Sequence, residues 1–222
     1  MREPFYTSHT AVEERILGSV LVARPAVLEA GCGRTTRLGR YRHRIRRLVG
    51  VDLDMAAGEE NRALDEFLPA DASGPLPFPP ASFDVVYANF VVEHLARPAV
   101  AFREWRRLLA PGGSLVLTTS NLSNPLLRAA RILPQRSRVA IKRDLAGAQE
   151  RDVFPAVYRS NTVSALDRDL TRAGFAARQV SGVATVHRYA GGHRRLAGAL
   201  KASERMLPAD RRSTLVAWYQ AA

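Results

Sequence analysis

The stretch VLEAGCGRT, residues 27–35, joins a short apolar run to a Gly-x-Gly turn and then to a predicted helix. The apolar run predicts a buried strand, Gly31 and Gly33 allow a tight turn, and Thr35 or Thr36 is a candidate N-cap. The bare backbone N–H groups of such a turn can lie directly against a ligand. An ordinary strand-turn-helix corner explains the stretch equally well, so the residues that follow must decide.

Two acidic residues follow at positions where a nucleoside pocket needs them. The run RLVGVD, residues 47–52, predicts a second buried strand that ends in the carboxylate of Asp52. That acid lies about 20 residues beyond the glycine turn, where it can accept hydrogen bonds from both hydroxyls of a ribose. Asp71 falls at the end of a third predicted strand. Its alternative role is to cap the turn through Ser73 and Gly74.

An ordered series of short motifs resembles the class I S-adenosylmethionine-dependent methyltransferases. The series covers about residues 25–121 and reads LEAGCG at 28–33, VD at 51–52, ADA at 70–72, LPF at 76–78, SFDVV at 82–86, EHL at 93–95 and LLAPGG at 108–113. The family often has a third glycine where this chain has Thr35, which leaves the path of the loop open. The resemblance implies a three-layer α/β/α Rossmann-like fold. Its seven-stranded sheet is mostly parallel, with the last strand antiparallel and a cap inserted after strand 5.

The same residues distinguish this chain from a nicotinamide dehydrogenase. A dinucleotide pyrophosphate needs Gly-x-Gly-x-x-Gly, and position 36 is threonine. Glu29, two residues before Gly31, would repel a pyrophosphate but suits a ligand that carries a sulfonium and an amino group. The acid therefore favours a positively charged cofactor.

The resemblance assigns S-adenosylmethionine as the cofactor and gives the acids separate roles. Glu29 would contact its amino end directly or through water, Asp52 would hold the ribose, and Asp71 would accept from the adenine amino group. The predicted cofactor-binding residues are Glu29, Gly31, Cys32, Gly33, Asp52, Leu53, Asp71, Ala72 and Asn89.

The candidate catalytic residues are His94 and Glu93, just beyond the fourth predicted strand, residues 83–90. Ligands of open parallel sheets lie outside the carboxyl ends of the strands, which places both residues near the chemistry. Because the ordinary pKa of histidine is near neutral, His94 is the first choice for a base toward a hydroxyl acceptor, and Glu93 is the second. In the alternative, Glu93 is a cap or surface acid and His94 a packed turn residue.

Residues 120–160 are rich in arginine, interrupted by prolines, and too long for an ordinary strand-to-helix loop. We predict an inserted substrate cap; an insertion that merely covers the sheet edge is the alternative. The exit of this segment resembles one seen in some members of the family. It provides the predicted substrate contacts Tyr158, Arg159 and Asn161.

Periodicity and turn signals place the remaining elements. We expect helices at residues 8–21, 36–46, 55–67, 98–109, 162–173 and 194–206. Strands are expected at residues 114–119, 176–186 and 215–219, with a type II turn over residues 111–113.

Composition predicts one methyltransferase domain over residues 1–222, since 46% apolar residues suffice for one core. Cys32 is the sole cysteine, and with five scattered histidines it gives no metal signature. The sequence has neither an apolar signal core at its start nor an 18-residue apolar run, and we therefore predict a cytoplasmic protein. The formal charge of +12 attracts anions, but nearly all the cations are arginines spread along the chain.

We therefore predict an enzyme, an S-adenosylmethionine-dependent methyltransferase that acts on a small-molecule acceptor by direct in-line transfer. The acceptor can be anionic. Two other classes stay open: a tRNA or rRNA methyltransferase, supported only by the charge, and a binding protein that has kept the fold and lost catalysis. The sequence does not predict the oligomeric state.

Overall fold

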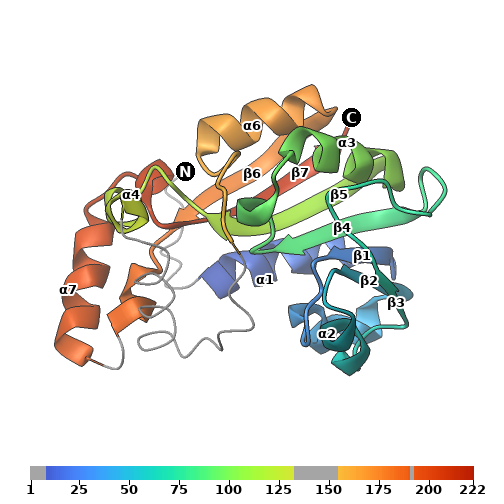
Figure 1. Cartoon of the computed structure of the whole chain (residues 1–222), viewed down its shortest axis with the longest axis horizontal. Helices are drawn as coiled ribbons and strands as arrows, with labels where there is room; N and C mark the ends of the chain where they lie inside the picture. The colour runs from blue at the N-terminus through green and yellow to red at the C-terminus, as the bar shows by residue number, and fades with distance from the viewer. Residues whose placement is uncertain (1–8, 133–154, 191–192) are drawn as a thin grey trace.

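The computed structural model describes residues 9–132, 155–190 and 193–222, which fold around one seven-stranded sheet (Figure 1). The strand order is β3-β2-β1-β4-β5-β7-β6. β7 is antiparallel to both of its neighbours, and the other described pairs are parallel. The strands are β1 (Ala26–Ala30), β2 (Arg47–Asp52), β3 (Glu66–Pro69), β4 (Phe83–Asn89), β5 (Leu109–Ser120), β6 (Phe175–Val183) and β7 (Thr214–Ala221). The predicted fold class is confirmed.

Helices cover both faces of the sheet. α1 lies on one face, and α3 and α6 lie side by side on the other (Figure 1). The helical elements are α1 (His9–Val20), η1 (Arg37–Arg44), α2 (Met55–Glu60), η2 (Val92–His94), α3 (Pro98–Leu108), α4 (Pro125–Ile132), α6 (Val163–Arg172), η4 (Val186–Ala190), α7 (Arg194–Arg205) and η5 (Ala209–Arg211). None of the helices within the described ranges is long and apolar enough to cross a membrane.

Alternating side chains of each strand serve two separate cores. In β4, Val86 and Ala88 belong to the core beneath α3 and α6, together with Trp105. Val85 and Tyr87 belong to the core beneath α1. Because successive side chains of a strand point to opposite faces, this division also tells which face each polar residue at a strand end occupies.

The helix predicted over residues 55–67 is wrong beyond Glu60, because Glu66 and Phe67 begin β3. The cause is polar pairing with β2. The Asp65 carboxylate accepts a hydrogen bond from Leu48 N at 2.7 Å, and Glu66 forms two hydrogen bonds with the Arg47 guanidinium. These contacts draw the chain into the sheet as an edge strand.

Other boundaries differ less from the expectation. The predicted helix at 36–46 is a 3-10 helix, and Thr36 is its N-cap, with its hydroxyl accepting from Leu38 N. Gly112 has φ +74°, which fits the third position of a type II turn. β5 nevertheless begins at Leu109 and runs through this turn, and β6 ends at Val183 rather than at residue 186. Residues 133–154 of the predicted cap lie outside the described residues.

Candidate functional site

The glycine turn after β1 has a conformation that requires glycine. Gly31 and Gly33 have φ of +72° and +52°. A Cβ on Gly31 would lie 2.5 Å from Cγ2 of Val91, so the backbone passes close to the loop after β4. Gly31 N and Cys32 N both donate to Val51 O, at 2.7 and 3.1 Å. The turn is therefore fixed against the end of β2.

Asp52 at the end of β2 holds the turn from the other side. Its Oδ2 accepts from Gly33 N at 2.8 Å, and its Oδ1 accepts from Asp54 N at 2.9 Å. A carboxylate has about four acceptor positions, so capacity remains on both oxygens for the two hydroxyls of a ribose. The two backbone hydrogen bonds fix the orientation of the Asp52 carboxylate toward such a ligand.

Asn61 is a site residue that sequence reasoning missed. It is buried, and its Nδ2 donates to Cys32 O at 3.2 Å and to Gly33 O at 3.1 Å. The side chain thus satisfies the carbonyls of the turn, while their N–H groups face β2 and Asp52. Asn61 was missed because it fell inside the helix wrongly predicted over residues 55–67. A residue inside that helix gave no reason to expect contact with the glycine turn.

Two buried oxygens near the turn lack a hydrogen-bond partner among the residues that the structure describes: Oε2 of Glu29 and Oδ1 of Asn89. Glu29 is only 3% exposed. Burial raises the pKa of its carboxyl to about 8, the negative charges of Glu13 and Asp52 add to the shift, and a hydrogen bond from Thr36 opposes it. Buried acceptors without donors are costly, so this pair fits a ligand with an ammonium group.

The other predicted cofactor residues differ in character. The Cys32 thiol is 2% exposed, and burial raises its pKa to about 12, so it fills space rather than reacting. Leu53 is 69% exposed beside Asp52. Asp71 is exposed and its Oδ1 accepts from Ser73 N at 2.8 Å, which is the turn-capping role. Ala72 is buried, and its carbonyl accepts from Trp105 Nε1 at 2.9 Å. Contact of these four residues with the cofactor remains a prediction.

His94 ends η2, beyond β4, and is partly exposed. Its Nδ1 lies 2.8 Å from Pro155 O. Because a carbonyl can only accept, this contact makes Nδ1 the donor. The contact also orients the ring, as a general base requires.

Glu93 is not a surface acid, because it is 5% exposed. Its Oε2 accepts from the Thr119 hydroxyl at 2.7 Å, and its Oε1 accepts from the Ser120 hydroxyl at 3.0 Å. Its backbone carbonyl accepts from Val157 N and Tyr158 N. Each carboxylate oxygen thus accepts a hydrogen bond that joins η2 to β5, and these bonds together with burial make Glu93 a structural anchor and the weaker candidate for a base.

The predicted substrate residues lie on the segment that these contacts hold at the carboxyl end of β5. Tyr158 has φ +55°, and the Arg131 guanidinium lies 5.8 Å from the centroid of its ring. Asn161 is buried, its Nδ2 donates to Thr119 Oγ1 and Ser120 O, and its Oδ1 has no hydrogen-bond partner within the described residues. Arg159 is exposed. Substrate contact by these residues is still a prediction.

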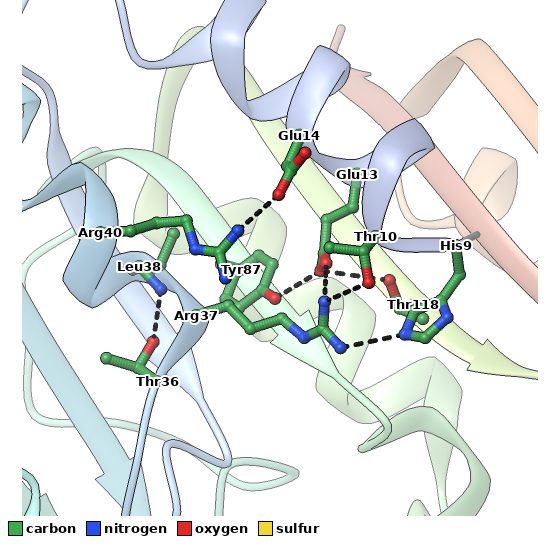
Figure 2. A network of polar contacts seen from close by, with 10 residues as sticks. All are labelled: His9, Thr10, Glu13, Glu14, Thr36, Arg37, Leu38, Arg40, Tyr87 and Thr118. Atoms are coloured by element: carbon green, nitrogen blue, oxygen red, sulfur yellow. Dashed lines mark hydrogen bonds and ion pairs between the residues drawn. The ribbon is translucent and has the colours of Figure 1, made fainter. Parts of the chain in front are cut away.

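A buried polar network beneath α1 also escaped sequence reasoning (Figure 2). Glu13 is 1% exposed, forms an ion pair with Arg37, and accepts a hydrogen bond from Tyr87 of β4. A signal was present, since Glu13 lies at helical spacing from Ile16 and Leu17 on the apolar face of its helix. A charged residue on such a face needs a buried partner.

Comparison with known proteins agrees with this geometry. Residues 28–117 match the family described as a methyltransferase domain. Over this span the comparisons support a class I S-adenosylmethionine-dependent methyltransferase domain. The matched span includes both glycines, Asp52 and Asn89, so the methyltransferase domain contains the loops just described. The predicted family and cofactor are confirmed.

The relatives found differ in the share of their length that this chain covers. A malonyl-[acyl-carrier protein] O-methyltransferase of Erwinia pyrifoliae is 34% identical over 125 residues, which are 51% of this chain and 46% of that protein. A probable S-adenosylmethionine-dependent methyltransferase of Mycolicibacterium smegmatis is 37% identical over 43% of this chain and 38% of its own length. The chain thus spans less than half the length of these curated relatives. An S-adenosylmethionine-dependent methyltransferase structure from Mesorhizobium loti shares the fold, with TM-score 0.62, 21% identity, and coverage of 95% and 96% of the two chains.

Proposed function

We propose that this protein is an S-adenosylmethionine-dependent methyltransferase that transfers a methyl group directly to a small-molecule acceptor. One observation carries the proposal: the unpartnered buried oxygens of Glu29 and Asn89 lie at the carboxyl ends of β1 and β4. Asp52 offers acceptor capacity at the end of the adjacent strand β2. Acceptors of this kind suit a cofactor with one ammonium group and one ribose.

Each residue of the proposed site would hold a different part of the cofactor. S-adenosylmethionine, when bound, supplies a methyl group on a positively charged sulfur. Glu29 and Asn89 would accept from the ammonium group, Asp52 from the ribose hydroxyls, and Asp71 from the adenine amino group. The chain's main task is then orientation, which is worth about 7–11 kcal/mol of a barrier when the reacting atoms are held in line.

Proton removal depends on the acceptor. A hydroxyl acceptor must lose a proton, and His94 Nε2 would take it while Pro155 O fixes the ring. A carboxylate acceptor is already ionised and needs no base. The malonyl-[acyl-carrier protein] O-methyltransferase of Erwinia pyrifoliae is named for a malonyl acceptor, which supports an anionic acceptor as one form of the proposal.

The arginines support a small acceptor better than a nucleic acid. Several of those near the site are paired within the chain: Arg34 with Asp54 and Glu60, and Arg37 with Glu13. The formal charge of +12 therefore overstates the positive charge available there. A cytoplasmic location is part of the proposal, supported by the buried free thiol of Cys32.

The test is cofactor binding followed by turnover with the wild-type protein. S-adenosylhomocysteine should raise the thermal midpoint and NAD should not, since ligand at a hundredfold excess over its Kd stabilises by about 2.7 kcal/mol. Radiolabelled S-adenosylmethionine is then offered with small hydroxyl, amine and carboxylate acceptors, with carrier-linked acids, and with tRNA. Label on tRNA with a steep salt dependence would instead support the RNA class. Cofactor binding without transfer to any acceptor would support a binding protein.

A further inference from the structure

Arg37 on η1 contacts α1 through one guanidinium, in a group that we call the α1 clamp: His9, Thr10, Glu13 and Arg37 (Figure 2). Its Nη1 donates to Thr10 Oγ1 at 3.0 Å and to Glu13 Oε2 at 2.9 Å. Its Nη2 lies 3.0 Å from His9 Nε2. Three residues of the first turns of α1 thus contact a single side chain from the element that follows the glycine turn.

The clamp continues into the sheet through Glu13. The other carboxylate oxygen, Oε1, accepts from the Tyr87 hydroxyl of β4 and from the Thr118 hydroxyl of β5. Glu13 and Tyr87 are both buried. The carboxylate is therefore fully engaged, and its charge is balanced by Arg37 alone among these partners.

The clamp also adjoins the proposed binding point for the amino group. Tyr87 is the direct neighbour of Glu29 in the pairing of β4 with β1, and both side chains point toward α1. The Thr36 hydroxyl forms a hydrogen bond with Glu29, and Arg37 is the next residue. The clamp and the proposed amino-group site are therefore neighbours on the same face of the sheet.

Charge explains why this arrangement matters. Glu13 and Glu29 are two buried acids, and the negative charge of Glu13 adds to the burial that raises the pKa of Glu29. With Arg37 in place, Glu13 is balanced and Glu29 is the acid left to meet a cation. Without Arg37, Glu13 would be a buried acid without its counterion, and the first turns of α1 would lose three contacts.

We propose that Arg37 is a positioning residue for the amino-acid end of the cofactor. It acts by holding α1 and Glu13 against the face of the sheet that carries Glu29. This inference rests on the proposed function and extends it to a residue outside the glycine turn. Arg37 acts through other residues and is assigned no contact with the reacting atoms. Its loss should therefore affect the part of the ligand beside α1 and spare the nucleoside part held by Asp52.

Two ligands separate the two parts. S-adenosylhomocysteine has an amino-acid end, whereas 5′-methylthioadenosine keeps the nucleoside and thioether but lacks that end. Titration calorimetry of Arg37→Gln should show a loss of about tenfold or more in affinity for S-adenosylhomocysteine, the scale of one charge-assisted hydrogen bond. The affinity for 5′-methylthioadenosine should stay within about twofold of wild type.

Arg40→Gln is the matched control. Arg40 also joins η1 to α1, through an ion pair with Glu14, but that pair is largely exposed and lies outside the clamp. Both ligands should bind Arg40→Gln as they bind wild type. Arg37→Lys should recover part of the lost affinity, because an ammonium can reach Glu13 but cannot also present the second nitrogen to His9. It also serves as the test variant if Arg37→Gln does not fold.

The outcomes are distinguishable. Equal losses for both ligands would mean that Arg37 only supports the fold, and unchanged or tighter binding of S-adenosylhomocysteine would mean that the clamp does not position the site. Either result overturns the inference. If wild type binds neither ligand, the proposed function fails first. The ligand-free variant should unfold at a lower temperature than wild type, because Glu13 loses its counterion, and the expected result is a loss of affinity confined to S-adenosylhomocysteine.

Discussion

The proposed cofactor side of this sheet differs from the proposed acceptor side in how its buried polar groups are paired. After β1 and β4, Glu29 and Asn89 each keep an oxygen without a hydrogen-bond partner in the described chain. At the end of β5, two hydroxyls donate to the Glu93 carboxylate of η2, and the Asn161 amide nitrogen donates twice. The proposed cofactor side has two acceptors that lack donors in the described chain, whereas most polar groups of the proposed acceptor side bind one another, with Asn161 Oδ1 as an exception.

Glu204 on α7 extends that contrast farther along the acceptor side. It is fully buried, and its carboxylate accepts from Val186 N at 2.7 Å, Ser213 N at 2.8 Å and Asn124 Nδ2 at 3.1 Å. These bonds join α7 to α4, η4 and the start of β7. The same residue types thus serve ligand binding on one side and structure on the other. The two roles are told apart by whether the buried polar atoms already have hydrogen-bond partners within the chain.

The largest expected effect tests whether the acceptor side contains any chemistry. If the acceptor is a hydroxyl, His94→Gln should lower kcat by about 10²–10⁴ and change the pH–rate profile, because the base is lost. Affinity for S-adenosylhomocysteine should not change. A loss below about tenfold with an unchanged profile would leave positioning, or a carboxylate acceptor, as the whole mechanism.

The next effect concerns Glu29, whose carboxyl has its pKa raised to about 8 by burial and by the charges of Glu13 and Asp52. Below that pH, an ammonium ligand must displace the proton of the carboxyl. The affinity for S-adenosylhomocysteine should therefore rise with pH by up to about tenfold per unit below pH 8 and then level off. Calorimetry from pH 6 to 9 measures this slope, and a flat Glu29→Gln profile is the expected control.

Stability of the ligand-free protein should change in the opposite direction. Between the ordinary pKa of 4.5 and about 8, Glu29 keeps its proton in the folded chain and loses it in the unfolded chain. The folded state then binds more protons, so the Glu29 contribution to the free energy of unfolding falls as pH rises through this window. A difference in that free energy between wild type and Glu29→Gln that does not vary with pH would remove Glu29 from this role.

Asp52→Ala should produce a smaller loss on the same side. Hydrogen bonds to a charged group are worth about 1.5–3 kcal/mol, and we expect affinity for S-adenosylhomocysteine to fall by about 2 kcal/mol, or roughly 30-fold. Asp65→Ala is a matched control, since Asp65 also accepts from a backbone N–H, that of Leu48, but at the end of β2 away from Asp52. An equal ligand-induced thermal shift in wild type and Asp52→Ala would exclude Asp52 from the site.

The smallest effect on binding is expected at Glu204. Glu204→Gln replaces an oxygen that accepts with an amide that donates, so the free energy of unfolding should fall by about 1–3 kcal/mol. Affinity for S-adenosylhomocysteine should stay within about twofold of wild type. Urea unfolding and calorimetry measure the two quantities. A large loss of affinity would break the separation of the two sides.

The strands around the proposed cofactor site were predictable because each carries its own signal. The run 47–52 is an apolar strand that ends in an acid, and β2 covers those residues. β3 was misplaced because its residues are polar at an edge, where pairing of Glu66 with Arg47 and of Asp65 with Leu48 determines the structure. Such pairing is not local, so periodicity could not reveal it.

Predictability of the site residues follows the same rule. Gly31, Gly33 and Asp52 have local roles tied to a turn or a strand end, and they lie where the sequence predicts. The parts played by Asn61 and Arg37 depend on partners 24 to 29 residues away. The sequence predicts Glu93 near the reacting atoms. Its structural role depends on hydroxyl partners on β5, 26 and 27 residues along the chain.

The packing of Cys32 has a practical consequence for labelling. A Cβ on Gly50 would lie 2.8 Å from its sulfur, so the thiol fills the space left by a missing side chain. Burial, which raises its pKa to about 12, also keeps the thiolate scarce at neutral pH. Maleimide should therefore not react with Cys32 in the folded protein. A cysteine introduced at exposed Ser203 on α7 would then accept a single fluorophore, with no need to mutate the glycine turn.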